Sequence, residues 1–188
     1  MTAVSTTQTM TAAEYLALPP KAFGWASNLV DGEVVMGEPK PLHQRTAARL
    51  FFELEQWVRS GEGRGSVYLP LDVGIDDRNV YAPDLSWWRE GRDPEGEGDP
   101  PFPVPGIAIE VRSPSTWRYD IGAKKSGYER IGLPELWLVD TAASEVLVFR
   151  RSEPSAPAFD VSLELGTGDV LESPLLPGFA LPLERLFG

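Results

Sequence analysis

Two acidic residues stand inside apolar stretches of the sequence, where a carboxylate is unusual. Asp84 follows Pro83 within the run 79-NVYAPDLSWW-88, and Glu110 follows 107-IAI-109. A carboxylate in a buried strand is costly unless it is paired or binds a cation. If neighbouring strands bring both carboxylates to one edge of a sheet, they suit Mg²⁺ (or Mn²⁺), which takes oxygen ligands, water and substrate phosphate. The alternatives are an Asp84 that forms a turn and a Glu110 that faces solvent from an edge strand.

A local excess of basic residues follows Glu110. Within 110–130 five basic residues stand against three acidic ones, although the whole chain has a net charge of −11. Lys124 lies early in a predicted helix and could hold a scissile phosphate or orient the attacking water; its alternative is a solvated helix charge. Arg112 follows Glu110 by two residues, so on a strand both side chains face the same way. It is a candidate for a phosphate contact or for a structural ion pair.

Three further residues are weaker candidates for a role at such a site. Glu33 belongs to a predicted hairpin and either points into the same cleft or is exposed. His43 is the only histidine, at the N-terminal end of a predicted helix, where capping or surface exposure is common. Tyr128 is expected to pack in the core near the site with its hydroxyl tethered. We interpret Ser113 and Ser115 as turn formers, because no histidine follows that could activate a nucleophile.

The elements that must position these residues follow from turn residues and from the spacing of apolar residues. The pattern predicts helices at 11–20, 42–61 and 121–131, a hairpin over 29–39 turned at Asp31-Gly32, strands at 66–75, 79–88 and 107–113, a second hairpin of 135–140 with 145–150, a third hairpin around Gly166–Gly168, and a short terminal helix. Of the adjacent Trp87 and Trp88, one is expected in the core and the other exposed or at an interface, because neighbouring strand residues face opposite sides.

The order of these elements indicates the fold class. Strands and helices do not alternate regularly, so we expect an α+β fold with a mixed sheet rather than a doubly wound one. The 42–61 and 121–131 helices should cover opposite faces of the sheet, or one face and an edge. The length of 188 residues suits a single domain spanning 1–188.

Composition narrows the class of protein. The longest apolar runs are a few residues, so no transmembrane helix is expected. The N-terminus lacks the pattern of a secretory signal, and the absence of cysteine excludes disulfides and thiolate metal sites. A cytoplasmic protein is the simplest interpretation. The net charge of −11 argues against a protein that coats nucleic acid non-specifically, since such proteins use clustered Lys and Arg.

Taken together, the motifs resemble those of a large bacterial family of restriction-endonuclease-like proteins in the PD-(D/E)XK nuclease superfamily. The matching residues are Pro83-Asp84; Glu110-Val111 with Ser113-Pro114-Ser115; Asp120, Lys124 and Tyr128; and Gly132, Glu135, Trp137 and Asp140. The segments 31–39 with His43 and 165–187 resemble the family's opening and ending, so the similarity covers nearly the whole chain. The resemblance implies a central mixed β-sheet flanked by helices. It also implies that Asp84, Glu110 and the backbone carbonyl of Val111 bind the metal.

One position departs from the superfamily pattern. Arg112 stands where a lysine is expected, and arginine cannot give up its proton to act as a base. Lys124 resembles a relocated substitute. The resemblance implies a Mg²⁺-dependent endonuclease that acts on DNA, as a homodimer or larger homo-oligomer. The acidic chain also favours an oligomer, which could set basic 112–130 faces side by side, and we expect Trp87 or Trp88 at or near the contact. The alternative is a catalytically silent nuclease fold that serves as a binding or assembly module.

Overall fold

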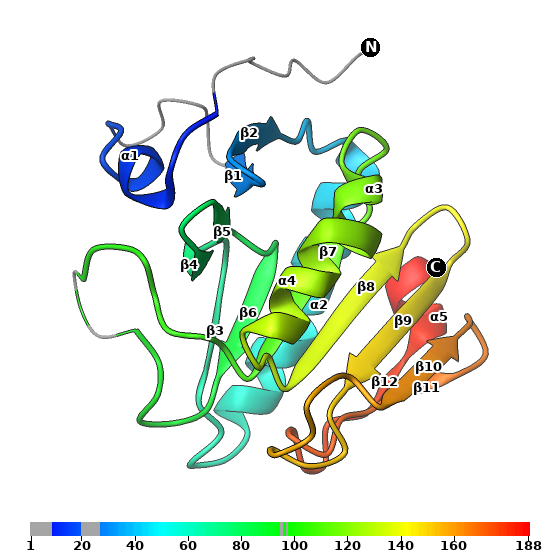
Figure 1. Cartoon of the computed structure of the whole chain (residues 1–188). Helices are drawn as coiled ribbons and strands as arrows, with labels where there is room; N and C mark the ends of the chain where they lie inside the picture. The colour runs from blue at the N-terminus through cyan, green and yellow to red at the C-terminus, as the bar shows by residue number, and fades with distance from the viewer. Residues whose placement is uncertain (1–8, 20–26, 95, 97) are drawn as a thin grey trace.

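The computed structural model describes residues 9–19, 27–94, 96 and 98–188. They form an α+β fold (Figure 1). In chain order the elements are α1 (Ala12–Leu16), β1 (Ser27–Val30), β2 (Glu33–Met36), α2 (Pro41–Arg59), β3 (Ser66–Tyr68), β4 (Val73–Asp76), β5 (Asn79–Tyr81), β6 (Leu85–Trp88), β7 (Ile107–Val111), α3 (Trp117–Tyr119), the π-helical turn η1 (Asp120–Lys124), α4 (Lys125–Arg130), β8 (Glu135–Asp140), β9 (Glu145–Arg150), β10 (Val161–Leu165), β11 (Val170–Leu171), β12 (Leu181–Pro182) and α5 (Leu183–Phe187).

A six-stranded central sheet has the order β10-β9-β8-β7-β6-β3. Its middle pair, β7 and β8, is parallel, and its other pairs are antiparallel. The sheet is therefore mixed, as the irregular order of elements predicted. All five residues of β7 are buried, which is why this strand reads as a continuous apolar run interrupted only by Glu110.

Helices cover opposite faces of the central sheet. On one face, Leu50 and Leu54 of α2 share a core cluster with Ile107 and Ile109 of β7, and α5 joins the same cluster. On the other face, Tyr128 of α4 packs with alternate residues of β7 and β8. Figure 1 shows α3 and α4 in front of the sheet and α2 behind it. Of the two arrangements left open by the sequence, the structure has the opposite-face one.

A smaller sheet of order β2-β1-β5-β4 lies beside the central sheet (Figure 1). Its β1–β2 hairpin turns at Asp31 and Gly32, whose φ angles of 52° and 82° are the left-handed values that an Asp-Gly hairpin turn requires. Helix α1 packs against this sheet through Tyr15, which shares a cluster with Leu29 and Val80.

Two strands predicted as continuous are broken. The segment 66–75 contains β3 and β4, and 79–88 contains β5 and β6. In each segment one part pairs in the small sheet and the other in the central sheet. Prolines at 70 and 83 stand in the two breaks, where the missing N–H group ends the ladder. Asp84 therefore lies in the connection between the two sheets and not within a strand, which corrects the sequence prediction.

Three further expectations need correction. Strand β10 pairs with β9, and β11 pairs with β12, so no hairpin turns around Gly166–Gly168. The predicted 121–131 helix begins earlier, at Trp117, and contains the π-helical turn. Trp87 and Trp88 are both buried, with 3% and 0% of their surface exposed. The reason is that both sides of β6 are covered: Trp87 packs edge-on against Trp57 of α2, while Trp88 meets Tyr68 and donates to the carbonyl of Pro103.

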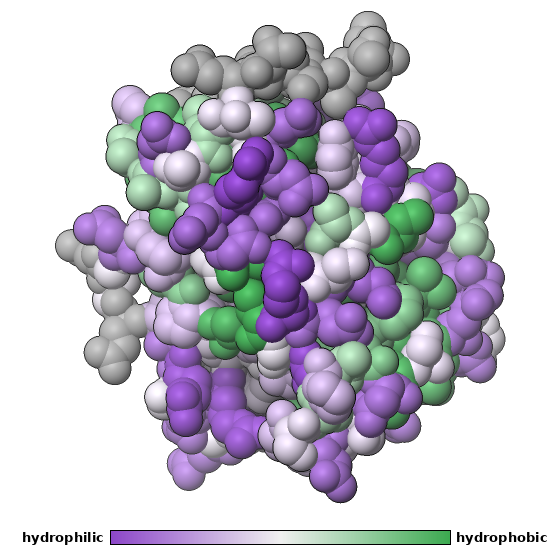
Figure 2. All heavy atoms as spheres, in the orientation of Figure 1, coloured by the Kyte–Doolittle hydropathy of each residue, from purple (hydrophilic) through white to green (hydrophobic). Residues whose placement is uncertain are grey.

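The face carrying α3 and α4 is largely hydrophilic, with apolar side chains gathered in small patches (Figure 2). Within the described residues, no helix combines the length and apolar character needed to cross a bilayer. The short terminal helix α5 and the β8–β9 hairpin agree with the sequence prediction.

Candidate active site

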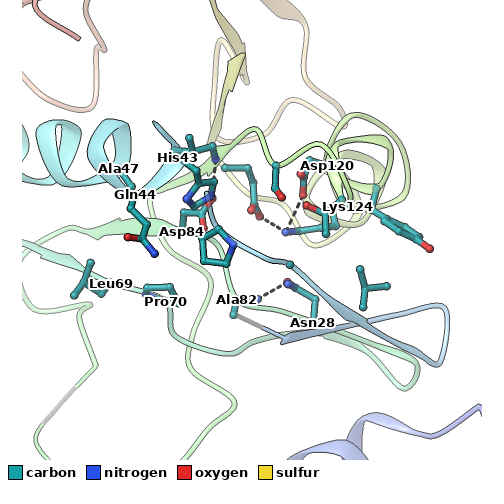
Figure 3. A pocket seen from close by; sticks show the side chains of 18 of the residues that line it. Asn28, His43, Gln44, Ala47, Leu69, Pro70, Ala82, Asp84, Asp120 and Lys124 are labelled. Carbon is teal, nitrogen blue, oxygen red and sulfur yellow. Dashed lines mark hydrogen bonds and ion pairs between the residues drawn. The ribbon is translucent and has the colours of Figure 1, made fainter. Parts of the chain in front are cut away.

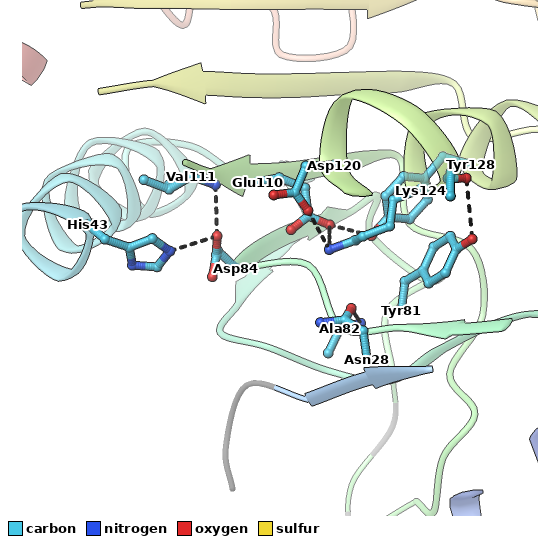
Figure 4. Close-up of polar contacts among 11 residues, drawn as sticks. Asn28, His43, Tyr81, Ala82, Asp84, Glu110, Val111, Asp120, Lys124 and Tyr128 are labelled. Atoms are coloured by element: carbon cyan, nitrogen blue, oxygen red, sulfur yellow. Dashed lines mark hydrogen bonds and ion pairs between the residues drawn. The ribbon is translucent and has the colours of Figure 1, made fainter. Parts of the chain in front are cut away.

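Asp84 and Glu110 converge on one cavity. Strands β6 and β7 are antiparallel, with Leu85 opposite Ile109, so Asp84, just before β6, lies beside the end of β7. The backbone N–H of Val111 donates to Oδ2 of Asp84 at 2.7 Å. This bond ties the Pro83-Asp84 turn to the residue that follows Glu110. Both carboxylates line the same cavity (Figure 4).

Lys124 lies between two buried carboxylates. Its Nζ is 2.6 Å from Oε1 of Glu110 and 3.1 Å from Oδ1 of Asp120. About 4% of each of these three side chains is exposed. The π-helical turn from Asp120 to Lys124 turns both of its end residues inward (Figure 4). The sequence motif includes Asp120 but assigns it no role. Its four-residue spacing from Lys124, which places both on one helix face, is the signal that indicates such a pair.

Two of the accessory candidates contact the carboxylates directly. Nε2 of His43, in the first turn of α2, lies 3.1 Å from Oδ2 of Asp84. The hydroxyl of Tyr128 donates to Oε1 of Glu110 at 2.7 Å, and its ring packs edge-on against Tyr81. His43 and Tyr128 thus hold one carboxylate each from opposite faces of the central sheet.

Two candidates lie elsewhere. The guanidinium of Arg112 donates to both carboxylate oxygens of Asp140, at 2.8 and 2.7 Å. The same guanidinium also lies over the ring of Trp117, and Arg112 is not among the described residues that line the cavity. Glu33 pairs with Val30 beside the hairpin turn and is not among the described residues that line the cavity.

Charge and burial oppose each other in this cluster. Burial raises the pKa of Glu110 to about 8 and also raises the pKa of Asp120. Burial alone would lower the pKa of Lys124, but the charges of Glu110 and Asp120 outweigh it and raise that pKa. The pKa of His43 is raised likewise, since the hydrogen bond and charge of Asp84 exceed the effect of burial. With Asp84 included, three carboxyl groups face one ammonium, so their ionised forms together carry an excess of negative charge that a bound cation would balance.

The cavity holds about 300 Å³ and opens past the small sheet and the first turns of α2 (Figure 3). Val111, whose carbonyl is the expected third ligand, also lines it. Among the described residues, no three His, Asp or Glu side chains are grouped so that they alone could hold a metal ion. A cation here would depend on Asp84, Glu110, backbone and solvent or substrate oxygens, which is the donor set that Mg²⁺ accepts.

Residues 12–184 match the Uma2 family, described as "Putative restriction endonuclease". The chain belongs to this family. The matched range includes both carboxylates, Lys124 and the helices that hold them. The family membership confirms the resemblance inferred from the motifs and supports a nuclease-type protein.

A solved structure gives the same fold. A protein from Anabaena variabilis, titled "a putative nuclease belonging to DUF820", superposes with a TM-score of 0.77 at 19% sequence identity, covering 95% of this chain and 97% of that one. At that identity the similarity establishes the fold, a restriction-endonuclease-like core with a central mixed sheet. No curated protein matches the chain.

Proposed function

We propose that this protein is a metal-dependent endonuclease that hydrolyses DNA phosphodiester bonds with Mg²⁺ or Mn²⁺. The observation that carries the proposal is the buried cluster in which Asp84 and Glu110 face one cavity with Lys124 between Glu110 and Asp120. A fold kept only for structure has no need of this arrangement, because burying carboxylates costs free energy that apolar side chains would not.

The excess negative charge of the cluster fits a divalent cation. Asp84 and Glu110 would bind it, together with the carbonyl of Val111. Such a cation would supply stabilisation of charge on the phosphate and a bound water of lowered pKa. The protein's own contribution is position: Val111 and His43 fix Asp84, and Tyr128 and Lys124 fix Glu110.

Lys124 would act on the phosphate. Hydrolysis joins a water oxygen to phosphorus and breaks one ester P–O bond; the water loses a proton and the leaving oxygen gains one. A fixed ammonium beside the carboxylates can hold a non-bridging oxygen as negative charge grows there. Because its raised pKa keeps Lys124 protonated, we assign it this role and not that of a general base.

The second candidate is a catalytically silent fold that binds or assembles. Arg112 favours it, because the position where the superfamily carries lysine holds a residue committed to Asp140. The first candidate predicts cleavage that depends on Asp84 and Glu110, and the second predicts no cleavage.

Cleavage of labelled DNA by the purified protein with Mg²⁺ or Mn²⁺, alongside metal binding by calorimetry, separates the candidates. Asp84→Asn should abolish cleavage and weaken metal binding. Asp140→Asn is the matched control, since Asp140 is also a part-buried carboxylate at a strand end but pairs with Arg112. A wild-type protein without cleavage would favour the silent fold, and cleavage that survives Asp84→Asn would show that it does not come from this site.

A further inference from the structure

The proposed reacting groups lie at the bottom of a narrow cavity. Glu110 and Lys124 have about 4% of their side chains exposed, and Asp84, the most accessible of the three, has 19%. The small sheet contributes Asn28 and Val35 to one wall, and α2 contributes Ala47 to another. Stacked bases hold the phosphates of an intact duplex on a thick, stiff rod, so a duplex phosphate reaches the buried groups of this cavity of about 300 Å³ less readily than the phosphate of a single strand.

The mouth of the cavity is apolar. Leu69 and Pro70, from the β3–β4 connection, lie on one side of it, and Ala47 of α2 lies on another (Figure 3). Leu69 keeps 60% of its surface exposed. Covering this apolar surface with a ligand would be favourable, because apolar surface is removed from water. Gln44 stands on the same side and carries an amide that can bond a base edge (Figure 3).

The lining is poor in positive charge. Lys124 is the only basic side chain other than His43 among the described residues that line the cavity. Proteins that follow a duplex backbone neutralise several phosphates with Lys and Arg. This cavity instead offers a single ammonium at its bottom and aliphatic walls above it. That combination suits one nucleotide, with the phosphate inside and an unstacked base against the wall.

We infer that the preferred substrate is single-stranded nucleic acid, from which one unstacked nucleotide enters the cavity. The inference rests on the proposed nuclease function and adds the substrate class. The phosphate reaches Lys124 and the Asp84–Glu110 pair, and the base lies against Leu69 and Pro70. A paired base reaches this position only after it unpairs and leaves its stack, which costs free energy that a single strand does not require.

The test compares one labelled DNA sequence in three forms, with Mn²⁺ present: single strand, blunt duplex, and duplex with an internal mismatched bubble. The single strand and the bubble should be cleaved at least about tenfold faster than the duplex, by kcat/KM. Calorimetry with Mn²⁺ accompanies the assay. Equal or faster cleavage of the blunt duplex would overturn the substrate class and leave the nuclease function standing. Bound Mn²⁺ without cleavage of any form would remove both.

Variants at the mouth test where the base lies. Leu69→Ala should raise KM for the single strand several-fold with little change in kcat, and Leu69→Trp should lower it because an aromatic ring stacks on a base. Leu163→Ala, at a part-exposed leucine on β10, is the matched control and should change neither. Leu69 variants that behave like Leu163→Ala would overturn the placement of the base.

Discussion

Lys124 and Arg112, the two candidate cations near Glu110 in the motif, differ in burial and in their partners. Lys124 is enclosed with Glu110 and Asp120, while the Arg112–Asp140 pair lies at the partly exposed end of β8. The sequence indicates both residues, because spacing along a strand cannot reveal that the guanidinium of Arg112 pairs with Asp140. The structure separates them.

Replacing each cation by methionine should therefore give different results. Lys124→Met removes the only ammonium from a buried acidic cluster, so it should lower the free energy of unfolding by about 3 kcal/mol and cleavage by about 100-fold or more. Arg112→Met should cost about 1 kcal/mol or less and leave cleavage nearly unchanged. Denaturant titration and cleavage rates measure both. Loss of cleavage in Arg112→Met with activity kept in Lys124→Met would contradict the assignment.

If Glu110 is a metal ligand, as proposed, metal binding is coupled to proton release. Its pKa of about 8, raised by burial from 4.5, means that the metal-free folded protein holds a proton which the unfolded chain releases at lower pH. The free energy of unfolding of the metal-free protein should therefore fall as pH rises from about 4.5 to 8. A bound cation must displace this proton.

The affinity for Mn²⁺ should accordingly rise with pH between about 6 and 8, by up to about tenfold per pH unit. Calorimetry in buffers of different ionisation enthalpy measures the number of protons released, which should approach one at the lower pH. An affinity independent of pH, with no proton released, would show that Glu110 is already ionised in the metal-free protein or is not a ligand.

Elements that belong to a single helix or a single sheet were mostly predicted correctly from the spacing of their apolar residues. Segments whose two halves join different sheets were not. The buried strand β7, the helix α2 and the β8–β9 hairpin match their sequence patterns. The segments 66–75 and 79–88 do not, because alternation along one strand carries no information on which sheet each half joins. The same limit hid the contact between His43 and Asp84, which are 41 residues apart. Helical spacing likewise gave no sign of the π-helical turn that orients Asp120 and Lys124.

Two glycines, one in η1 and one in α4, test how closely this helical segment packs against Tyr81. A Cβ at Gly127 would lie 2.6 Å from ring atoms of the buried Tyr81, whereas a Cβ at Gly122 would meet nothing within 4 Å. Gly127→Ala should cost about 1–3 kcal/mol through overpacking and weaken Mn²⁺ binding, because Tyr81 packs on Tyr128. Gly122→Ala should stabilise by about 0.4–1 kcal/mol. Thermal unfolding measures the stability of both variants, and equal effects of the two substitutions would show that α4 does not pack closely against Tyr81.

At the scale of the whole molecule, the burial of Trp87 and Trp88 removes one expected contact between subunits. The expected contact through Trp87 or Trp88 is wrong, because both side chains are inside the chain. The net charge of −11 remains, and it repels a polyanion at long range. Under the proposed function, we therefore expect binding of nucleic acid to depend on a small number of favourable contacts at the cavity.

The salt dependence of binding measures how many phosphates the protein neutralises. For single strands the slope of log K against log salt is about −0.7 for each neutralised phosphate. Among the described residues that line the cavity, Lys124 is the only strongly basic one. One or two phosphates are therefore expected, so the slope should lie between about −0.7 and −1.4. Fluorescence anisotropy of a non-hydrolysable single strand across a NaCl series gives this value. A slope near −4 would require about six phosphates and would indicate an extended track along the nucleic-acid backbone outside the cavity.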